Sequence, residues 1–395
     1  MRKYQFVWII IAAIAFNILP AKGQNQYAEN IVPAAERIWV YLPFIGDKPF
    51  AVVANHTSRV GDKHLVDTLV GMNYNLKKIF SPEHGFRGEA DAGTYLYNST
   101  DTVTGLPVIS LYGHNKKPKP RQLEDVDIVV FDIQDVGVRF YTYLSTLTYV
   151  MEACAENDKK LIVLDRPNPN GFYVDGPVLE PGFDSFVGMH PIPVVHGMTA
   201  AEYAHMVNDE GWINGDCNLI WVLAENYSHD KYYQLPEKPS PNLPDMASVY
   251  LYPSLCFFEG TTVSVGRGTE NPFSVYGHPQ LDYGGHTFVP RSGPGSSHPK
   301  LQGKQCRGEL LKPYGQNFQS KPHKLHLEWL IKAYNSLKDD GEFFNDYFDK
   351  LAGNSQLRKK IEAGMSAKEI RKSWKDDLNE FRKMRKKYLL YPDFK

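Results

Sequence analysis

The chain has 395 residues, of which 42% are hydrophobic and 23% are charged. This balance is typical of globular proteins and excludes a wholly disordered chain. The 44 Lys and Arg residues nearly cancel the 45 Asp and Glu residues, so the formal net charge of −1 favours neither nucleic acid nor an anionic membrane as a partner.

The N-terminal segment, residues 1–23, is predicted to be a secretory signal peptide. Arg2 and Lys3 precede an apolar run at 6–16, and small residues follow up to Gly23, where cleavage is expected. The run is too short for a membrane-spanning helix, which needs about 20 residues. No cysteine follows that would carry a lipid. We therefore expect a protein exported to the bacterial periplasm, without a membrane anchor after cleavage.

Strand and helix patterns alternate over the next part of the chain. Apolar, β-rich runs occur at 50–54, 76–80, 107–112, 128–131, 161–164 and 219–223, and helical spacing of apolar residues occurs at 62–72, 141–155 and 199–206. The last helix begins with a capping box formed by Thr199 and Glu202. Strands that alternate with helices predict an α/β fold, with a mostly parallel sheet and helices on both of its faces.

The composition changes after this region. Residues 236–300 are rich in Pro, Gly and Ser, which predicts loops, and helical patterns return after residue 324. We therefore expect a first domain at 24–245 and a smaller, mixed α+β C-terminal domain at 246–395.

Polar side chains cluster directly after four of the expected strands. They are Asn55, Glu83, His84, Arg87, Asp132, Gln134, Asp135, Arg139, Tyr141, Asp165, Arg166 and Asn168. In doubly wound sheets, ligands bind beyond the carboxyl ends of the strands. Turns and helix caps also use polar residues. Four consecutive ends with carboxylate, arginine and amide groups nevertheless favour one shared site.

The chemistry of these residues is that of carboxylates. Glu83 follows Pro82 and precedes a glycine turn, where a partly apolar pocket would suit it to protonate a leaving oxygen. Asp132 and Asp135, near Arg139, would serve as base, nucleophile or orienting group. A pair of carboxylates with different roles is typical of glycosidases. An N-cap role is the structural alternative for Asp135.

Motifs for other chemistries are absent from the sequence. It has no GxSxG elbow, P-loop, HExxH or CxxC motif, so we expect no cofactor and no metal ion. A metal site made of His56, His84 and Asp132 remains an alternative. Whether Cys256 and Cys306 form a disulfide stays open at this point.

Several long motifs resemble one known family. SPEHGFRGEADAG, DIVVFDIQDVGVRFYTYLST, VLDRPNPNG and FEGTTVSVGRGTENPF stand in the same order as in the exo-β-N-acetylmuramidase family of the NamZ type. The resemblance runs from about residue 36 to the final YLLY. It implies a Rossmann-like catalytic domain, a smaller C-terminal domain and a cleft between them. It also makes Glu83 a catalytic carboxylate, with Asp132 or Asp135 as its partner.

The family removes N-acetylmuramic acid from the non-reducing ends of peptidoglycan fragments, so such fragments are the expected partner. The lactyl carboxylate of this sugar would bind an arginine, for which Arg87, Arg139, Arg166 and Arg267 are the candidates. The acetamido group would contact Asn168, His190, His196 and Tyr141. Glu259 is expected at the rim of the cleft.

Two other functions remain open from the sequence. One is a metal-dependent hydrolase that acts on cell-wall material. The other is a non-catalytic protein that binds muropeptides. The oligomeric state is not predicted.

Overall fold

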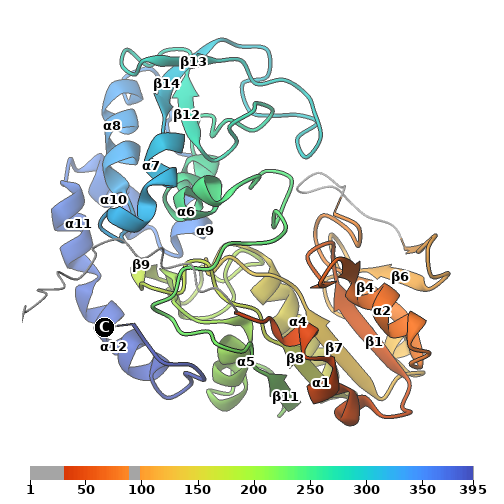
Figure 1. Ribbon diagram of the computed structural model, residues 1–395. Helices are drawn as coiled ribbons and strands as arrows, with labels where there is room; N and C mark the ends of the chain where they lie inside the picture. The colour runs from red at the N-terminus through yellow and green to blue at the C-terminus, as the bar shows by residue number, and fades with distance from the viewer. Residues whose placement is uncertain (1–30, 89–97, 395) are drawn as a thin grey trace, which may run out of the picture.

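The computed structural model describes residues 31–88 and 98–394. The predicted signal peptide lies outside the described residues. Figure 1 shows two lobes. We call the lobe formed by the described residues up to 245 the N-terminal lobe, and the lobe formed mainly by residues from 246 on the C-terminal lobe. Within the described ranges, no helix has the length and apolar character needed to cross a bilayer.

A seven-stranded sheet forms the centre of the N-terminal lobe. Its strands are β1 (Phe50–Ala54), β4 (Leu76–Ser81), β5 (Ser99–Thr100), β6 (Pro107–Ser110), β7 (Ile128–Asp132), β8 (Lys160–Leu164) and β11 (Asn218–Val222). Their order is β11-β8-β7-β1-β4-β6-β5, and only β5 is antiparallel to its neighbour. The six parallel strands therefore follow the order of dinucleotide-binding folds, with the direction of winding changing between β1 and β7. The predicted mostly parallel, Rossmann-like sheet is confirmed.

Both faces of this sheet are buried under helices. Ala51 and Val53 point to the face covered by α4 (Tyr143–Glu156) and α5 (Ala200–Asp209), whereas Phe50 and Val52 point to the face covered by α1 (Ile38–Ile45) and α2 (Leu65–Gly71). Because successive side chains of a strand alternate between faces, strands with apolar residues at every position can support both layers.

Of two helix starts expected from the sequence, one differs for a local reason and one is confirmed. The helix expected from Asp62 begins at Leu65, because a hairpin of β2 (Arg59–Val60) and β3 (Lys63–His64) precedes it and the His64 side chain accepts a hydrogen bond from Val66 N. The capping box of Thr199 and Glu202 is present at the start of α5 as expected.

The C-terminal lobe combines a small antiparallel sheet with helices. Strands β12 (Val275–His278), β14 (Cys306–Leu310) and β13 (His286–Phe288) lie in that order. The helices are α6 (Met246–Leu255), α7 (Lys312–Gln316), α8 (Leu327–Leu337), α9 (Tyr347–Ala352), α10 (Gln356–Glu362), α11 (Ala367–Ser373) and α12 (Lys375–Arg385). Asp245 caps α6 by accepting a hydrogen bond from Ser248 N, so a helix starts at the expected boundary.

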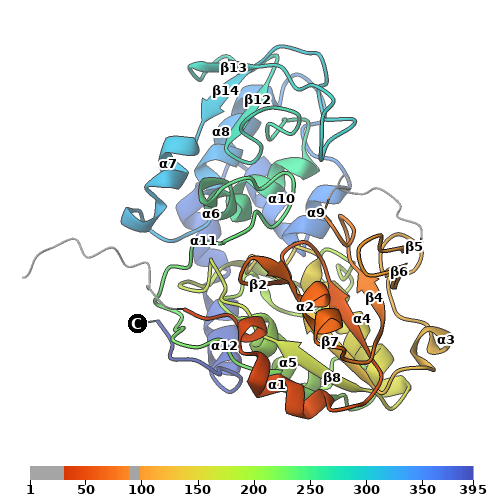
Figure 2. The same cartoon turned by 45° about the vertical axis from the view of Figure 1, so that its right-hand side comes forward.

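The end of the chain returns to the N-terminal lobe. Helix α12 packs against β9 (Asp175–Val178), which pairs with β10 (Pro193–Val195). In Figures 1 and 2, α12 lies beside the N-terminal lobe. The Arg385 guanidinium donates to Gly197 O, and the Tyr391 hydroxyl donates to the Asp165 carboxylate at 2.7 Å. Residues 246–395 are therefore not packed as a separate unit along their whole length.

Arg139 joins the two lobes from within. Its guanidinium donates to four backbone carbonyls, those of Pro177, Ile192, Leu351 and Ala352, at 2.8–2.9 Å. The first two belong to the N-terminal lobe and the last two to the end of α9. No carboxylate of a described residue pairs with Arg139, and burial lowers its pKa to about 9.

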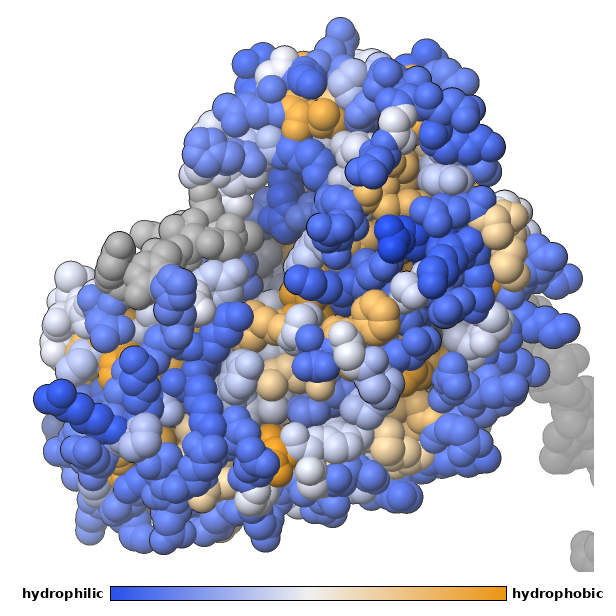
Figure 3. All heavy atoms as spheres, turned by 180° about the vertical axis from the view of Figure 1, so that it is seen from behind, coloured by the Kyte–Doolittle hydropathy of each residue, from blue (hydrophilic) through white to orange (hydrophobic). Residues whose placement is uncertain are grey.

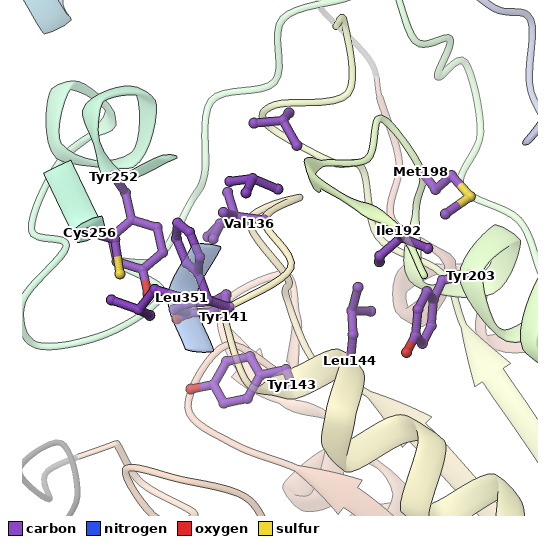
Figure 4. Packing of buried hydrophobic residues seen from close by; sticks show 14 of the residues in the cluster. Val136, Tyr141, Tyr143, Leu144, Ile192, Met198, Tyr203, Tyr252, Cys256 and Leu351 are labelled. Atoms are coloured by element: carbon purple, nitrogen blue, oxygen red, sulfur yellow. The ribbon is translucent and has the colours of Figure 1, made fainter. Parts of the chain in front are cut away.

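Apolar side chains surround this junction. Figure 4 shows Tyr252 and Leu351 of the C-terminal lobe beside Tyr141 of the N-terminal lobe. The rings of Tyr141 and Tyr252 meet edge to face, with centroids 5.8 Å apart. Contacts of this kind fix the relative position of the lobes through both packing and hydrogen bonds.

Arg139→Met should lower the free energy of unfolding by at least about 3 kcal/mol, because each buried carbonyl left without a donor costs roughly 1–3 kcal/mol. Urea denaturation followed by circular dichroism measures this loss. Arg121→Met, at an exposed position of helix α3 (Pro120–Leu123), is the control. A loss below about 1 kcal/mol for Arg139→Met would contradict the role assigned to Arg139.

Candidate active site

A cleft of about 1140 Å³ lies between the two lobes and is lined by residues of both. Seen from behind in Figure 3, the surface is hollowed where the lobes meet. The loops after β4, β6 and β7 form one wall. The opposite wall is formed by three segments of the C-terminal lobe: residues 252–273, residues 295–300 and the start of α9. The volume is slightly above the roughly 300–1,000 Å³ that is typical of pockets for small ligands.

Glu83 is the carboxylate that the N-terminal lobe presents to the cleft. It follows β4, where His84 adopts a left-handed backbone conformation with φ of 69°. The Thr142 hydroxyl donates to Glu83 Oε2 at 2.8 Å, and the Tyr112 hydroxyl also hydrogen-bonds this carboxylate. Burial and the neighbouring Glu83 raise the pKa of Tyr112, so its phenol stays protonated and donates. Two hydroxyl groups therefore orient the Glu83 side chain.

The C-terminal lobe contributes a second carboxylate and a guanidinium. Arg267 Nε lies 3.1 Å from Glu259 Oε2, and the guanidinium carbon is 4.8 Å from the ring centroid of Phe273. Within the described parts of the chain, the hydrogen bonds of Arg267 use only Nε. Lys300 also lines the cleft, but its ammonium donates to the carbonyls of Phe258 and Thr261. Arg267 thus retains donors that a ligand can use.

Five of the candidate residues from the sequence line this cleft. They are Glu83, His84, Tyr141, Glu259 and Arg267. Thr142, which follows the same strand as Tyr141, also lines the cleft, and sequence reasoning missed Tyr112, Lys116, Tyr143, Tyr252 and Tyr347. The strand-end rule, applied to β6, would have found Tyr112, which lies two residues after that strand. Tyr252 and Tyr347 come from the C-terminal lobe and have no comparable signal.

Three of the four arginines proposed for the lactyl group are held by the protein instead. Arg87 pairs with Asp67 and Asp101, at 3.2 and 3.0 Å. Arg166 forms a bidentate pair with Asp132, and Arg139 is enclosed by backbone carbonyls. None of the three lines the cleft, because each has its partners inside the N-terminal lobe or at the lobe junction.

The structure does not place Asp132 or Asp135 in the cleft with Glu83. Asp132 is fully buried and contacts Arg166 at 2.6 and 2.9 Å. Asp135 lies behind the cleft wall, where its Oδ2 accepts a hydrogen bond from Gly137 N at 2.6 Å. Burial raises the pKa of Asp135 to about 7. Both side chains are positioned to organise the loop after β7.

Three amide candidates also stabilise loops. Thr57 N donates to Asn55 Oδ1 at 2.9 Å, Gln134 Nε2 donates to Pro167 O at 2.8 Å, and Asn168 Nδ2 donates to Met198 O at 2.8 Å. The first contact lies within the turn after β1, the second joins the turns after β7 and β8, and the third joins the turn after β8 to the loop before α5. None of the three side chains lines the cleft.

Asp165, His190 and His196 are buried outside the cleft as well. Asp165 accepts hydrogen bonds from Ala201 N and the Tyr391 hydroxyl, and burial raises its pKa to about 7. Burial lowers the pKa of His190 to about 4 and that of His196 to about 3, so both imidazoles are neutral near pH 7. None of the three is among the residues that line the cleft.

The alternative metal site is not assembled. His56 Nε2 lies 2.8 Å from Lys238 O, and Asp132 is occupied by Arg166. Over residues 31–88 and 98–394, no group of three or more His, Cys, Asp or Glu side chains is arranged to hold a metal ion. The cysteines are free and buried, so Cys256 and Cys306 form no disulfide.

Asp135→Asn should change how stability depends on pH. The folded-state pKa of about 7 lies above the unfolded value of about 3.9, so ionisation of Asp135 costs wild-type stability as pH rises between these values. The variant lacks this cost. The difference in stability, variant minus wild type, should therefore be more favourable to the variant at pH 8 than at pH 5. Urea denaturation midpoints of both proteins at the two pH values measure this difference. An equal difference at both pH values would show that Asp135 does not titrate in this way.

Comparison with known proteins agrees with this architecture. The family model described as the N-terminal part of exo-β-N-acetylmuramidase NamZ matches residues 50–247, and the model of its C-terminal part matches residues 250–391. The peptidoglycan β-N-acetylmuramidase NamZ of Bacillus subtilis (strain 168) is 42% identical over 336 residues, which cover 80% of each chain.

Solved structures show the same fold. One DUF1343 family protein of Bacteroides fragilis NCTC 9343 superimposes with a TM-score of 0.86 and 46% identity, covering 92% of this chain and 100% of that chain. A second from the same organism has a TM-score of 0.76 and 27% identity, covering 91% and 99%. The two family models together span nearly the whole described fold, and the chain therefore belongs to the exo-β-N-acetylmuramidase NamZ family of glycoside hydrolases.

Proposed function

We propose that this protein is an exo-acting glycoside hydrolase that releases N-acetylmuramic acid from the non-reducing ends of peptidoglycan fragments in the bacterial periplasm. The observation that carries the proposal is the position of Glu83, a carboxylate oriented by two hydroxyl groups at the wall of a cleft between the lobes. The family relationship supplies the substrate class.

Glu83 acts as the general acid. In its protonated form it donates a proton to the glycosidic oxygen while the bond to the anomeric carbon breaks. The hydrogen bonds from Thr142 and Tyr112 restrict the rotation of the side chain. Orientation of this kind reduces the entropy lost on reaching the transition state.

The attack on the anomeric carbon is assigned to the acetamido oxygen of the substrate. Asp132 and Asp135 lie outside the cleft, and Glu259 is already paired with Arg267. Glu259 is therefore less suited to act as a free nucleophile. Substrate-assisted glycosidases use the acetamido group in this way, and water then opens the intermediate.

Arg267 recognises the lactyl carboxylate. It is the one arginine of the four sequence candidates that lines the cleft, and its terminal nitrogens stay available beside Glu259. A guanidinium has five N–H donors, so it can bind the substrate carboxylate and Glu259 together. The stacking on Phe273 holds its plane in place.

Glu83→Gln should lower kcat on a muramic acid glycoside by about 10²–10⁴-fold, since general acid catalysis contributes this much. The amide keeps the shape of the side chain but carries no proton of suitable acidity. Circular dichroism checks that the variant is folded. Glu180→Gln, an exposed carboxylate outside the cleft, is the matched control. Retention of more than about half of the wild-type rate would remove Glu83 as the acid.

Arg267→Met should narrow the preference for a muramic acid glycoside over its N-acetylglucosamine analogue. We expect a wild-type preference of at least about tenfold in kcat/KM, since hydrogen bonds to charged groups are worth roughly 1.5–3 kcal/mol. In the variant the ratio should fall below about threefold. Arg291→Met, an exposed arginine of the same lobe, should keep the wild-type ratio. An unchanged ratio in Arg267→Met would exclude Arg267 from lactyl recognition.

A further inference from the structure

A further cation, besides Arg267 and Lys300, lines the cleft and has no use in the chemistry above. Lys116 lines the cleft in the loop after β6, with its ammonium nitrogen 4.6 Å from the ring centroid of Phe186. It is half-buried. A cation over an aromatic face is attracted by the negative charge density of the ring, so Phe186 holds the ammonium at the cleft wall.

The Phe186 ring, which contacts Lys116, is held in place by two kinds of contact. Ser185 and Gly188 exchange both backbone hydrogen bonds, at 2.8 and 3.0 Å, so Phe186 stands at the tip of a tight turn. Its ring also stacks on Tyr149 of α4, with centroids 6.2 Å apart and an angle of 18° between the planes. Phe186 is therefore fixed by backbone and ring contacts together.

Lys116 differs from its neighbour in charge pairing. Lys117 pairs with Glu152 at 2.9 Å and with Glu156 at 2.6 Å. Among the residues whose placement is described, no carboxylate lies within ion-pair distance of Lys116; its described contact is with the ring of Phe186. A positive charge that lines a cleft without a counter-charge is suited to an anionic part of a ligand.

Lys116 and Arg267 line the cleft from different lobes. Tyr112, which hydrogen-bonds Glu83, packs 6.1 Å from Phe186, and Phe186 contacts Lys116. Toward the C-terminal lobe, the rings of Tyr141 and Tyr252, then those of Tyr252 and Phe273, lead to Arg267 with centroids 5.8 and 4.9 Å apart. Aromatic contacts thus connect Glu83 to Lys116 within the N-terminal lobe, and Tyr141 to Arg267 in the C-terminal lobe.

We propose that Lys116 binds a carboxylate on the leaving-group side of the scissile bond. The inference rests on the proposed function, in which Arg267 holds the lactyl group of the sugar that is released. In an alternating glycan of N-acetylmuramic acid and N-acetylglucosamine, the first sugar after the cleaved bond is neutral. The second carries the next lactyl carboxylate, and Lys116 recognises that group. The enzyme then favours fragments longer than a disaccharide.

The test compares two peptide-free substrates, a disaccharide and a tetrasaccharide, each with N-acetylmuramic acid at its non-reducing end. Lys116→Gln should lower kcat/KM on the tetrasaccharide roughly three- to tenfold more than on the disaccharide, mainly through KM, as expected for one ion pair at a partly exposed site. Lys117→Gln is the matched control and should alter the two values equally. Lys116→Arg should restore the wild-type ratio.

Equal losses on both substrates, or no loss on either, would overturn the assignment of Lys116. If the wild type released no N-acetylmuramic acid from either substrate, the proposed function itself would fail. The wild type could instead cleave both substrates while Lys116→Gln and Lys117→Gln show the same ratio of kcat/KM on the tetrasaccharide to that on the disaccharide. That result would contradict only the inference about Lys116 and leave the proposed function in place.

Discussion

The guanidinium of Arg139 lies buried between the two lobes and donates hydrogen bonds to carbonyls on both sides of the junction. The cleft depends on this contact, because Glu83 belongs to one lobe and Arg267 to the other. Their separation is set where the lobes meet, at Arg139 and at the ring contact between Tyr141 and Tyr252. A planar group with five fixed donors holds such a junction in a more defined geometry than a lysine would.

The sheet has the strand order of dinucleotide-binding folds, but its usual binding crevice is closed. That crevice lies where the winding changes, beyond β1 and β7. Here the Asp132–Arg166 pair occupies this place, and the Ser58 hydroxyl donates to Asp132 O. The cleft lies beside this place, where the loops after β4, β6 and β7 face the C-terminal lobe. The protein therefore has the sheet of a dinucleotide-binding fold, but its cleft is not at the usual binding crevice of that fold.

Much of this arrangement followed from local patterns in the sequence. The alternation of strand and helix patterns indicated a mostly parallel sheet, and the Thr199–Glu202 capping box marked the start of α5. Glu83 was recognisable because it ends a strand within a distinctive motif. The partners of the arginines were not predictable, since Asp67 and Asp101 carry no local signal for their pairing with Arg87. The same limit applies to Asp132, whose pairing with Arg166 joins the ends of two strands.

The most direct test of the account is to incubate the purified protein with a chromogenic N-acetyl-β-muramic acid glycoside beside its N-acetylglucosamine analogue. The account predicts release of the chromophore and of free N-acetylmuramic acid from the first substrate, with kcat/KM at least about tenfold above that for the second. Comparable values for the two glycosides would contradict lactyl recognition in the cleft. Binding of the muramic acid glycoside without release of free sugar would show that the cleft recognises the sugar but does not cleave it.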